Sequence, residues 1–279
     1  MVADATRALV EDVFDRKEIF GGLHQIRKRI VAWGPGKEPV TLPHSAVALS
    51  EEQLLERLRP ATIQPPPGNP NWTIYASRPL APSATEHHFG TRVATATPVR
   101  LRADPSACWI ESLENGWLFL IASSNTTGWL LSVGNDSVES SRLIARQVEI
   151  SGPSQTFPAY PRIAFPLCEA QWLACGTAAL AFDPVCGDGT GNAIREAILA
   201  TAVIQKAAGS FDVLEHYQTR LLAGFQRHLE QCAPFYATGH DTDWWRSELE
   251  HIREGIAWCQ SQPRRPYRYQ LRDFNLETL

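Results

Sequence analysis

The stretch QWLACGTAALAFDPVCGDGTGNAIREAILATAVIQK, residues 171–206, decides the fold. A short apolar run, residues 172–174, ends at a glycine corner where Gly176 and the small residues after it let the backbone approach a neighbour closely. Asp183 and Pro184 predict a second turn, because proline fixes φ and aspartate bonds its own backbone. The first half of the stretch therefore predicts a strand followed by two successive turns.

The second half of the stretch changes to helical periodicity. Glycines alternate with polar residues over 187–191, and apolar residues then recur at helical spacing up to Lys206. We assign Asn192 as the helix N-cap. A glycine-rich loop that leads into a helix presents free backbone N–H groups and the positive end of the helix dipole, so this segment predicts a seat for an anion or an electron-rich ring edge.

These residues resemble the second flavin-binding segment of FAD-dependent aromatic-ring hydroxylases and flavin-dependent halogenases. In that family a G-D-A-A-type turn is followed by D-P-x-x-G-x-G and a long helix. The resemblance implies the following FAD-binding residues: Gly176, Thr177, Ala178, Asp183, Pro184, Gly187, Asp188, Gly189 and Thr190. Thr177 departs from the family, which usually has an acid at this position, and a hydroxyl bonds there more weakly than a carboxylate.

A second departure concerns the first flavin-binding segment. The family begins with a strand, a G-x-G-x-x-G turn and a helix that seat the FAD diphosphate. No such motif lies near the start of this sequence. Three explanations stay open: a misplaced gene start, a partner chain that supplies the missing nucleotide-binding unit, and a degenerate homologue that has lost FAD.

Composition excludes several classes of function. The chain has 279 residues and a formal net charge of -4, which offers no electrostatic footprint for nucleic acid or an anionic membrane. No apolar run reaches the length of a membrane span, and the N-terminus lacks an apolar signal core, so we expect a cytoplasmic protein. The six cysteines form no C-x-x-C motif and no histidine pair has metal-binding spacing, so free thiols and no metal are expected.

The periodicity changes to two over residues 91–134, which predicts an antiparallel sheet of successive hairpins. Asn115-Gly116 predicts a type I′ turn. The segment resembles the substrate-domain sheet of the same family, whose halogenases carry W-x-W-x-I-P where this chain has residues 117–122. Trp117 fits that motif and Phe119 does not, which favours a hydroxylase or oxidase over a halogenase. The candidate substrate residues are Trp117, Phe119 and Tyr160, with sheet core as the alternative role of the two aromatic residues in the strand.

The flanking segments predict mostly helices. Residues 1–20, 141–147 and three C-terminal segments have helical spacing, and Ser50 with Gln53 forms a capping box before an apolar helix face. Short strands are expected at residues 30–33 and 42–49. Residues 60–72 are proline-rich and predict an extended connection. The basic C-terminal tail is interpreted as a solvated surface strand, with docking onto a partner as the alternative.

Together these features predict an α/β fold with an α+β substrate sheet: a partial FAD-binding, Rossmann-like domain (residues 1–60 and 160–210), an inserted antiparallel sheet (61–159) and a C-terminal helical region (211–279). The resemblance implies an FAD-dependent monooxygenase that acts on a small aromatic or protein substrate, with NAD(P)H or a reductase as electron donor. The alternatives are a non-catalytic module that has lost the cofactor and one half of a split flavoprotein. No catalytic base is identified.

Overall fold

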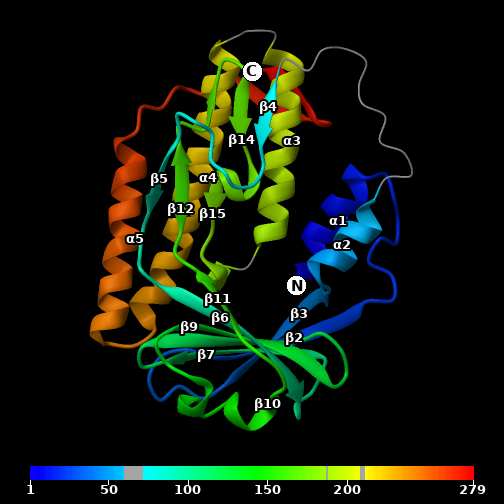
Figure 1. Cartoon of the computed structure of the whole chain (residues 1–279), viewed down its shortest axis with the longest axis vertical. Helices are drawn as coiled ribbons and strands as arrows, with labels where there is room; N and C mark the ends of the chain where they lie inside the picture. The colour runs from blue at the N-terminus through cyan, green and yellow to red at the C-terminus, as the bar shows by residue number, and fades with distance from the viewer. Residues whose placement is uncertain (60–71, 187, 208–210) are drawn as a thin grey trace. The chain divides into compact units, whose positions relative to one another are not determined.

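The computed structural model of the protein describes residues 1–59, 72–186, 188–207 and 211–279. The chain forms two compact units, each built from several segments (Figure 1). Unit 1 comprises Met1–Ile63, Thr91–Ala159 and Pro234–Leu249, and unit 2 comprises Gln64–Gly90, Tyr160–Ala233 and Glu250–Leu279. The predicted proline-rich connection lies mostly outside the described residues.

Unit 1 is built on a nine-stranded sheet, in the order β1-β3-β2-β7-β8-β9-β6-β10, with β11 also paired to β6. All of its strand pairs are antiparallel except β2 with β7. The hairpins expected from the period-two pattern are therefore confirmed. The strands are β1 (Val2–Ala3), β2 (His24–Ala32), β3 (Val40–Ala48), β6 (Val93–Leu101), β7 (Ala107–Leu113), β8 (Gly116–Ala122), β9 (Thr127–Gly134), β10 (Val148–Ile150) and β11 (Gln155–Pro158).

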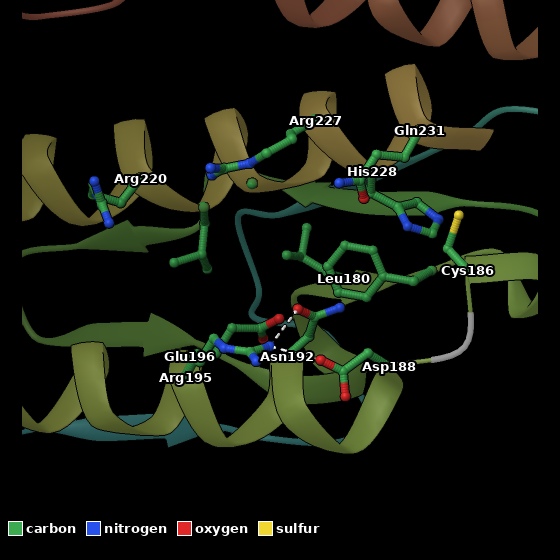
Figure 2. Close-up of a pocket in the computed structure, with 13 residues that line it drawn as sticks. Leu180, Cys186, Asp188, Asn192, Arg195, Glu196, Arg220, Arg227, His228 and Gln231 are labelled. Carbon is green, nitrogen blue, oxygen red and sulfur yellow. Dashed lines mark hydrogen bonds and ion pairs between the residues drawn. The ribbon is translucent and has the colours of Figure 1, made fainter. Parts of the chain in front are cut away.

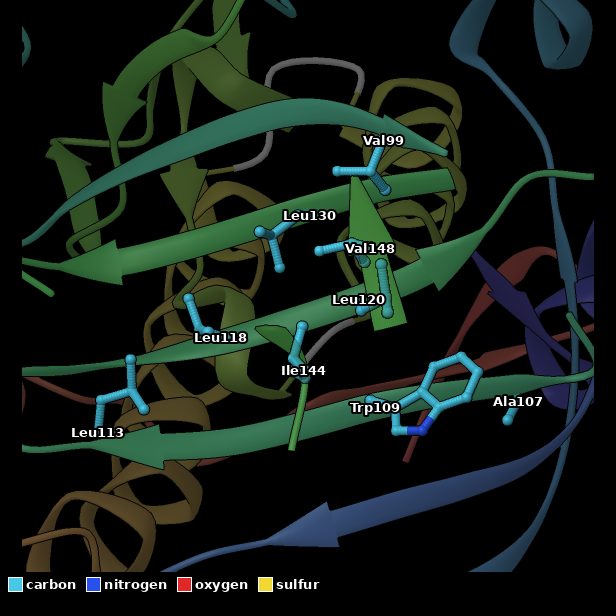
Figure 3. Packing of buried hydrophobic residues seen from close by; sticks show 9 residues of the cluster. All are labelled: Val99, Ala107, Trp109, Leu113, Leu118, Leu120, Leu130, Ile144 and Val148. Atoms are coloured by element: carbon cyan, nitrogen blue, oxygen red, sulfur yellow. The ribbon is translucent and has the colours of Figure 1, made fainter. Parts of the chain in front are cut away.

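The hydrophobic core of this sheet gathers on alternate positions of neighbouring strands (Figure 3). Leu118 and Leu120 on β8 face the same cluster as Leu130 on β9, because residues two apart in a strand share a face. Burying large apolar side chains of this kind stabilises a fold by about 1.5–3 kcal/mol each. The cluster comprises Val99, Ala107, Trp109, Leu113, Leu118, Leu120, Leu130, Ile144 and Val148.

The turn between β7 and β8 differs from the prediction. Leu113 pairs with Gly116, so the two-residue loop is Glu114-Asn115, and neither loop residue has a positive φ. The predicted type I′ turn is therefore wrong. Gly116 is instead the first residue of β8, where it allows close packing against β9, because a Cβ there would lie 2.2 Å from the carbonyl oxygen of Val133.

Unit 1 also contains two helices near the N-terminus: α1 (Asp4–Val13) lies between β1 and β2 in the chain, and α2 (Glu51–Leu58) follows β3. The predicted capping box is confirmed: the backbone N–H of Gln53 donates to Ser50 Oγ at 3.1 Å, and the backbone N–H of Ser50 donates to Gln53 Oε1 at 2.9 Å. The helix expected at 141–147 is wrong. One short 3-10 turn, Val138–Ser140, precedes the segment, and a second, Ala145–Gln147, forms its end. The buried Glu111 carboxylate accepts the backbone N–H groups of residues 142–144 between them.

Unit 2 contains two three-stranded sheets, in the orders β15-β12-β5 and β13-β14-β4, and a hairpin of β16 with β17. The pair β14 and β4 is parallel, although residues 73–75 were predicted to belong to the antiparallel sheet. The strands are β4 (Thr73–Tyr75), β5 (Thr85–His88), β12 (Arg162–Phe165), β13 (Cys168–Glu169), β14 (Trp172–Ala174), β15 (Leu180–Ala181), β16 (Tyr269–Arg272) and β17 (Asn275–Thr278). The helices are α3 (Gly189–Ala207), α4 (Phe211–Thr238) and α5 (Asp243–Ser261), of which α4 and α5 each span a boundary between the two units.

The fold class is the mixed α/β architecture that the sequence predicts. The two compact units divide the chain differently from the predicted domains. Strand β3 pairs with β2 and β2 pairs with β7, so residues 24–48 belong to the same sheet as the antiparallel strands. The tail is a hairpin and not a single strand: Asp273 and Phe274 both have positive φ, which is the backbone geometry of a tight two-residue loop. None of the helices in the described residues is both long and apolar enough to cross a bilayer.

Candidate functional site

The glycine corner lies at the carboxyl ends of the parallel strands β14 and β4. The Cys175 amide donates to the Tyr75 carbonyl at 2.9 Å, which brings the two chain segments together. Gly176 has a φ of 55°, and a Cβ there would lie 2.9 Å from the carbonyl oxygen of Ala76. The corner therefore needs glycine for its own backbone packing. In open α/β sheets this edge is also where ligands bind.

Glu196 of helix α3 bonds to the same corner. Its Oε2 accepts the backbone N–H of Gly176 at 2.7 Å, and the side chain is buried. Burial raises the pKa of the carboxyl group to about 7, while the bond from Gly176 acts in the opposite direction. A carboxyl group with this pKa can take up or release a proton near neutral pH.

The Asp183-Pro184 turn forms as the sequence predicts. Asp183 is buried, and its Oδ1 accepts the Val185 N–H at 2.8 Å, which is the local bond expected of aspartate in a turn. A single 3-10 turn, Pro184–Cys186, follows. The Asp183 amide donates to Nε2 of His228 at 2.7 Å, so helix α4 fixes the position of the loop.

Helix α3 begins earlier than predicted. Its first residue is Gly189, so Asn192 lies inside the first turn and the N-cap assignment is wrong. Asp188 takes the capping role: its Oδ1 accepts the Gly191 N–H at 3.2 Å, and its Oδ2 pairs with Arg195 at 2.8 Å. A carboxylate at a helix N-terminus is favoured by the helix dipole.

A cavity of about 480 Å³ adjoins this loop and the first turns of α3. Its size falls within the range of roughly 300–1,000 Å³ that is typical of small-molecule sites. Figure 2 shows Arg227, His228 and Gln231 of α4 across the cavity from Asp188 and Asn192. The full lining is Leu180, Phe182, Cys186, Asp188, Asn192, Arg195, Glu196, Arg220, Leu221, Gly224, Arg227, His228 and Gln231.

The lining combines cationic and apolar groups. Arg195, Arg220 and Arg227 contribute guanidinium groups, which suit phosphate recognition because of their planar fork of donors. Phe182 and the leucine residues of the lining supply the apolar surface. Among the described residues, Arg227 forms no ion pair with a carboxylate. The cavity is thus suited to a ligand with both an anionic and a flat apolar part.

The structure brings only part of the predicted FAD set to this cavity. Asp188 lines it, and Gly187 lies outside the described residues. The other predicted residues do not line the cavity; Thr177, for example, donates its hydroxyl to the Ala76 carbonyl at 3.4 Å. The residues outside the lining are Gly176, Thr177, Ala178, Asp183, Pro184, Gly189 and Thr190.

The predicted substrate residues occupy different environments. Trp117 is only 1% exposed and packs in the core of unit 1, where its ring centroid lies 6.4 Å from that of Trp33. Phe119 is half-buried against the neighbouring cluster of Ile26, Ala46, Cys108 and Ala122. Tyr160, in unit 2, lies with its ring 5.2 Å from the ring of His88. Trp117 thus has the core role that the sequence left open as an alternative.

Sequence reasoning missed a cluster at the rim of the cavity. Cys186 Sγ lies 3.4 Å from Cys232 Sγ, which lies 3.4 Å from His228 Nε2. The available signal was the spacing of four between His228 and Cys232, which places both on one face of a helix. A search for cysteine pairs and histidine pairs overlooks such a mixed pair.

No known protein-family model matches the sequence, and no curated protein matches it. Solved structures do match the fold. The flavin-dependent halogenase CmlS superposes with a TM-score of 0.70 and 16% identity over 94% of this chain and 63% of its own. This chain therefore spans less than two thirds of that halogenase.

Two further flavin-dependent enzymes are similar along nearly the whole chain. The myxobacterial chondrochloren halogenase CndH gives a TM-score of 0.69 at 16% identity, over 92% of this chain and 79% of its own. The peptidyl tryptophan dihydroxylase QhpG, essential for tryptophylquinone cofactor biogenesis, gives a TM-score of 0.68 at 16% identity, over 100% of this chain and 77% of its own. The chain therefore has the fold of flavin-dependent halogenases and related FAD-dependent oxidoreductases.

Proposed function

We propose that this protein is an FAD-dependent oxidoreductase of the monooxygenase type, with an aromatic small molecule or an aromatic side chain of a protein as its substrate. The observation that carries the proposal is the fold, which matches flavin-dependent enzymes over 92–100% of the chain. The cavity in unit 2 adds support, because the loop that resembles the family's flavin-binding segment forms one of its walls.

The residues of the cavity fit the chemistry of FAD. Arg195, Arg220 and Arg227 would hold the diphosphate through charge-assisted hydrogen bonds. Leu180 and Phe182 would pack against apolar parts of the cofactor and exclude water. When bound, FAD would supply the redox-active ring that accepts reducing equivalents from NAD(P)H or a reductase and activates dioxygen.

Glu196 is the residue of this chain best suited to move a proton at the site. It lines the cavity and its carboxyl pKa is about 7, so both protonation states are populated near neutral pH. We assign it as the proton-holding group, because a general acid or base works best when its pKa lies near the working pH.

Titration of the purified chain with FAD tests the proposal. Wild-type protein is expected to quench flavin fluorescence and to give a saturable isotherm. Arg227→Ala is expected to weaken binding about tenfold, the lower end for a charge-assisted hydrogen bond at an exposed site. Arg253→Ala is the matched control, because Arg253 is an exposed arginine outside the cavity. This variant should bind FAD as tightly as wild type does.

Two outcomes would contradict the proposal. If wild-type protein gives no saturable signal with FAD, the chain is better described as a binding module that has the fold without the cofactor. If Arg227→Ala and Arg253→Ala bind FAD equally well and as tightly as wild type, the cofactor does not use this cavity.

A further inference from the structure

Three soft or borderline ligand atoms converge at one end of the cavity. Cys186 comes from the turn after Pro184, and His228 and Cys232 lie one turn apart on α4. The two sulfur atoms are 3.4 Å apart, Cys232 Sγ is 3.4 Å from His228 Nε2, and the three atoms all lie within 4.8 Å of one another. Two thiols and an imidazole are the side chains that Zn²⁺ prefers.

The spacing of these atoms is close to that of a tetrahedral zinc site. With Zn–S bonds of about 2.3 Å and Zn–N bonds of about 2.0 Å, tetrahedral angles place two sulfurs about 3.8 Å apart and a sulfur and nitrogen about 3.5 Å apart. The two observed separations of 3.4 Å are only a few tenths of an ångström shorter, and Cys186 Sγ lies within 4.8 Å of the His228 ring nitrogen. Side-chain rotation that brings Cys186 Sγ closer to His228 would complete the coordination of the ion.

The environment suits a site with three protein ligands. Cys232 and His228 are buried and Cys186 is half-buried, so most of the coordination shell is shielded from bulk water. Cys186 and His228 also line the cavity, which leaves one side of the cluster facing open space. Sites with three protein ligands and one exchangeable position are typical of catalytic zinc.

We propose that Cys186, His228 and Cys232 bind one Zn²⁺ ion, with a fourth coordination position open to the cavity for water or a ligand. Binding releases the two thiol protons to solvent, so two thiolates neutralise the ion and no net charge is added at the buried site. The proposal stands independently of FAD, because it uses only residues of this chain.

One existing hydrogen bond opposes the metal. His228 Nε2 accepts the Asp183 N–H at 2.7 Å, and coordination through this nitrogen would break that bond. Coordination would remove this acceptor from the Asp183 amide and so weaken zinc binding, whereas two thiolates and one imidazole are ligands that favour it.

The test uses the full chain, made metal-free under reducing conditions and without flavin. Titration with Zn²⁺ against a chromophoric chelator is expected to give one ion per chain and to raise the melting temperature. Co²⁺ as a spectroscopic substitute is expected to give the thiolate-to-metal charge-transfer and visible bands of a tetrahedral sulfur-ligated ion. This measurement on wild type needs no variant that might fail to fold.

Two serine variants locate the site. Cys186→Ser is expected to weaken Zn²⁺ binding by more than about 100-fold and to abolish the charge-transfer bands of Co²⁺, because a hydroxyl is a poor ligand for these ions. Cys175→Ser is the matched control, since Cys175 is a buried thiol outside the cluster, and it should bind as wild type does. Circular dichroism checks that both variants fold.

Any of three results would overturn the proposal. Wild-type protein could show no charge-transfer bands with Co²⁺ and no stoichiometric zinc. Cys186→Ser could bind zinc as tightly as wild type. Mass spectrometry of the protein purified without reductant could show a Cys186–Cys232 disulfide, which would consume both sulfur ligands.

Discussion

Glu196 shows how one buried carboxyl group links stability to pH. Burial raises its pKa from 4.5 to about 7, so the folded protein holds a proton that the unfolded chain releases. Between about pH 4.5 and 7 the folded state binds the additional proton, and the stability contributed by this group falls as pH rises through that window. The loss amounts to the order of 3 kcal/mol.

Glu196→Gln should remove this dependence. The amide keeps an oxygen that can accept the Gly176 N–H but cannot ionise. The variant is therefore expected to gain stability relative to wild type at pH 8, and much less at pH 5, as measured by urea unfolding at both values. Glu254→Gln, at an exposed position, serves as the control. An equal effect of Glu196→Gln at pH 5 and pH 8 would contradict the assignment of a raised pKa.

A second prediction concerns the buried ion pair of Arg92 and Glu248 in unit 1. Their side chains are 0% and 1% exposed, and Glu248 Oε1 also accepts the Thr91 hydroxyl at 2.9 Å. Glu248→Gln removes the charge and keeps an acceptor, which leaves the Arg92 cation buried without its carboxylate. We expect a loss of about 3–5 kcal/mol in the free energy of unfolding.

The exposed pair of Arg253 and Glu250 provides the comparison for that experiment. Its atoms are 3.4 Å apart and both side chains are more than 60% exposed. Glu250→Gln should change the unfolding free energy by less than about 1 kcal/mol, because solvent screens the pair. Similar losses in the two variants would mean that the Arg92 pair is not desolvated in solution.

At the scale of elements, the helices of unit 2 pack more closely at one glycine than at another. Gly255 in α5 sits where a Cβ would lie 2.8 Å from the Phe89 ring and 2.9 Å from Leu229 Cδ1. At Gly224 in α4, an added Cβ would meet no neighbouring atom within 4 Å. Gly255→Ala should therefore destabilise the protein by roughly 1–3 kcal/mol through overpacking.

Gly224→Ala is the matched variant for helix propensity. It should stabilise the protein by about 0.5–1 kcal/mol, because alanine loses less backbone entropy in a helix interior. Thermal unfolding of both variants distinguishes the two effects by their opposite signs. A stabilising Gly255→Ala would show that α5 does not approach Phe89 and Leu229 of α4 as closely as the structure places it.

Elements that depend on local chemistry were predictable from the sequence. The capping box at Ser50 and the turn at Asp183 follow from side chains that bond to nearby backbone, and the long helix after the turn follows from its apolar periodicity. The position of the helix start was missed because Asp188 caps the helix through the Gly191 N–H, whereas Asn192 was assigned as the N-cap. Local propensity fixes the existence of an element better than its ends.

Features that depend on distant contacts were not predictable. The first part of the strand at residues 24–32 lacks a clear period, so only residues 30–33 were predicted as a strand. The pairing of residues 28–32 with residues 107–111 joins this strand to the hairpins of unit 1. The Cys186, His228 and Cys232 cluster likewise joins segments 42 or more residues apart through the packing of α4 on the turn. Only the four-residue spacing of His228 and Cys232 was visible in the sequence.

For the whole molecule, the fold is that of flavin-dependent oxidoreductases, whereas the chain lacks the G-x-G-x-x-G segment that seats the FAD diphosphate in the family. Under the proposed function, Arg195 of α3 and Arg220 and Arg227 of α4 would bind the phosphates of FAD.

Isothermal titration of the purified wild-type chain with FAD, with adenosine diphosphate as a competitor, tests this claim most directly. We predict one FAD per chain, competition by the diphosphate, and affinity that falls as salt concentration rises, because arginine–phosphate contacts are screened. The absence of any binding heat with FAD at low salt would contradict the claim that this chain binds FAD.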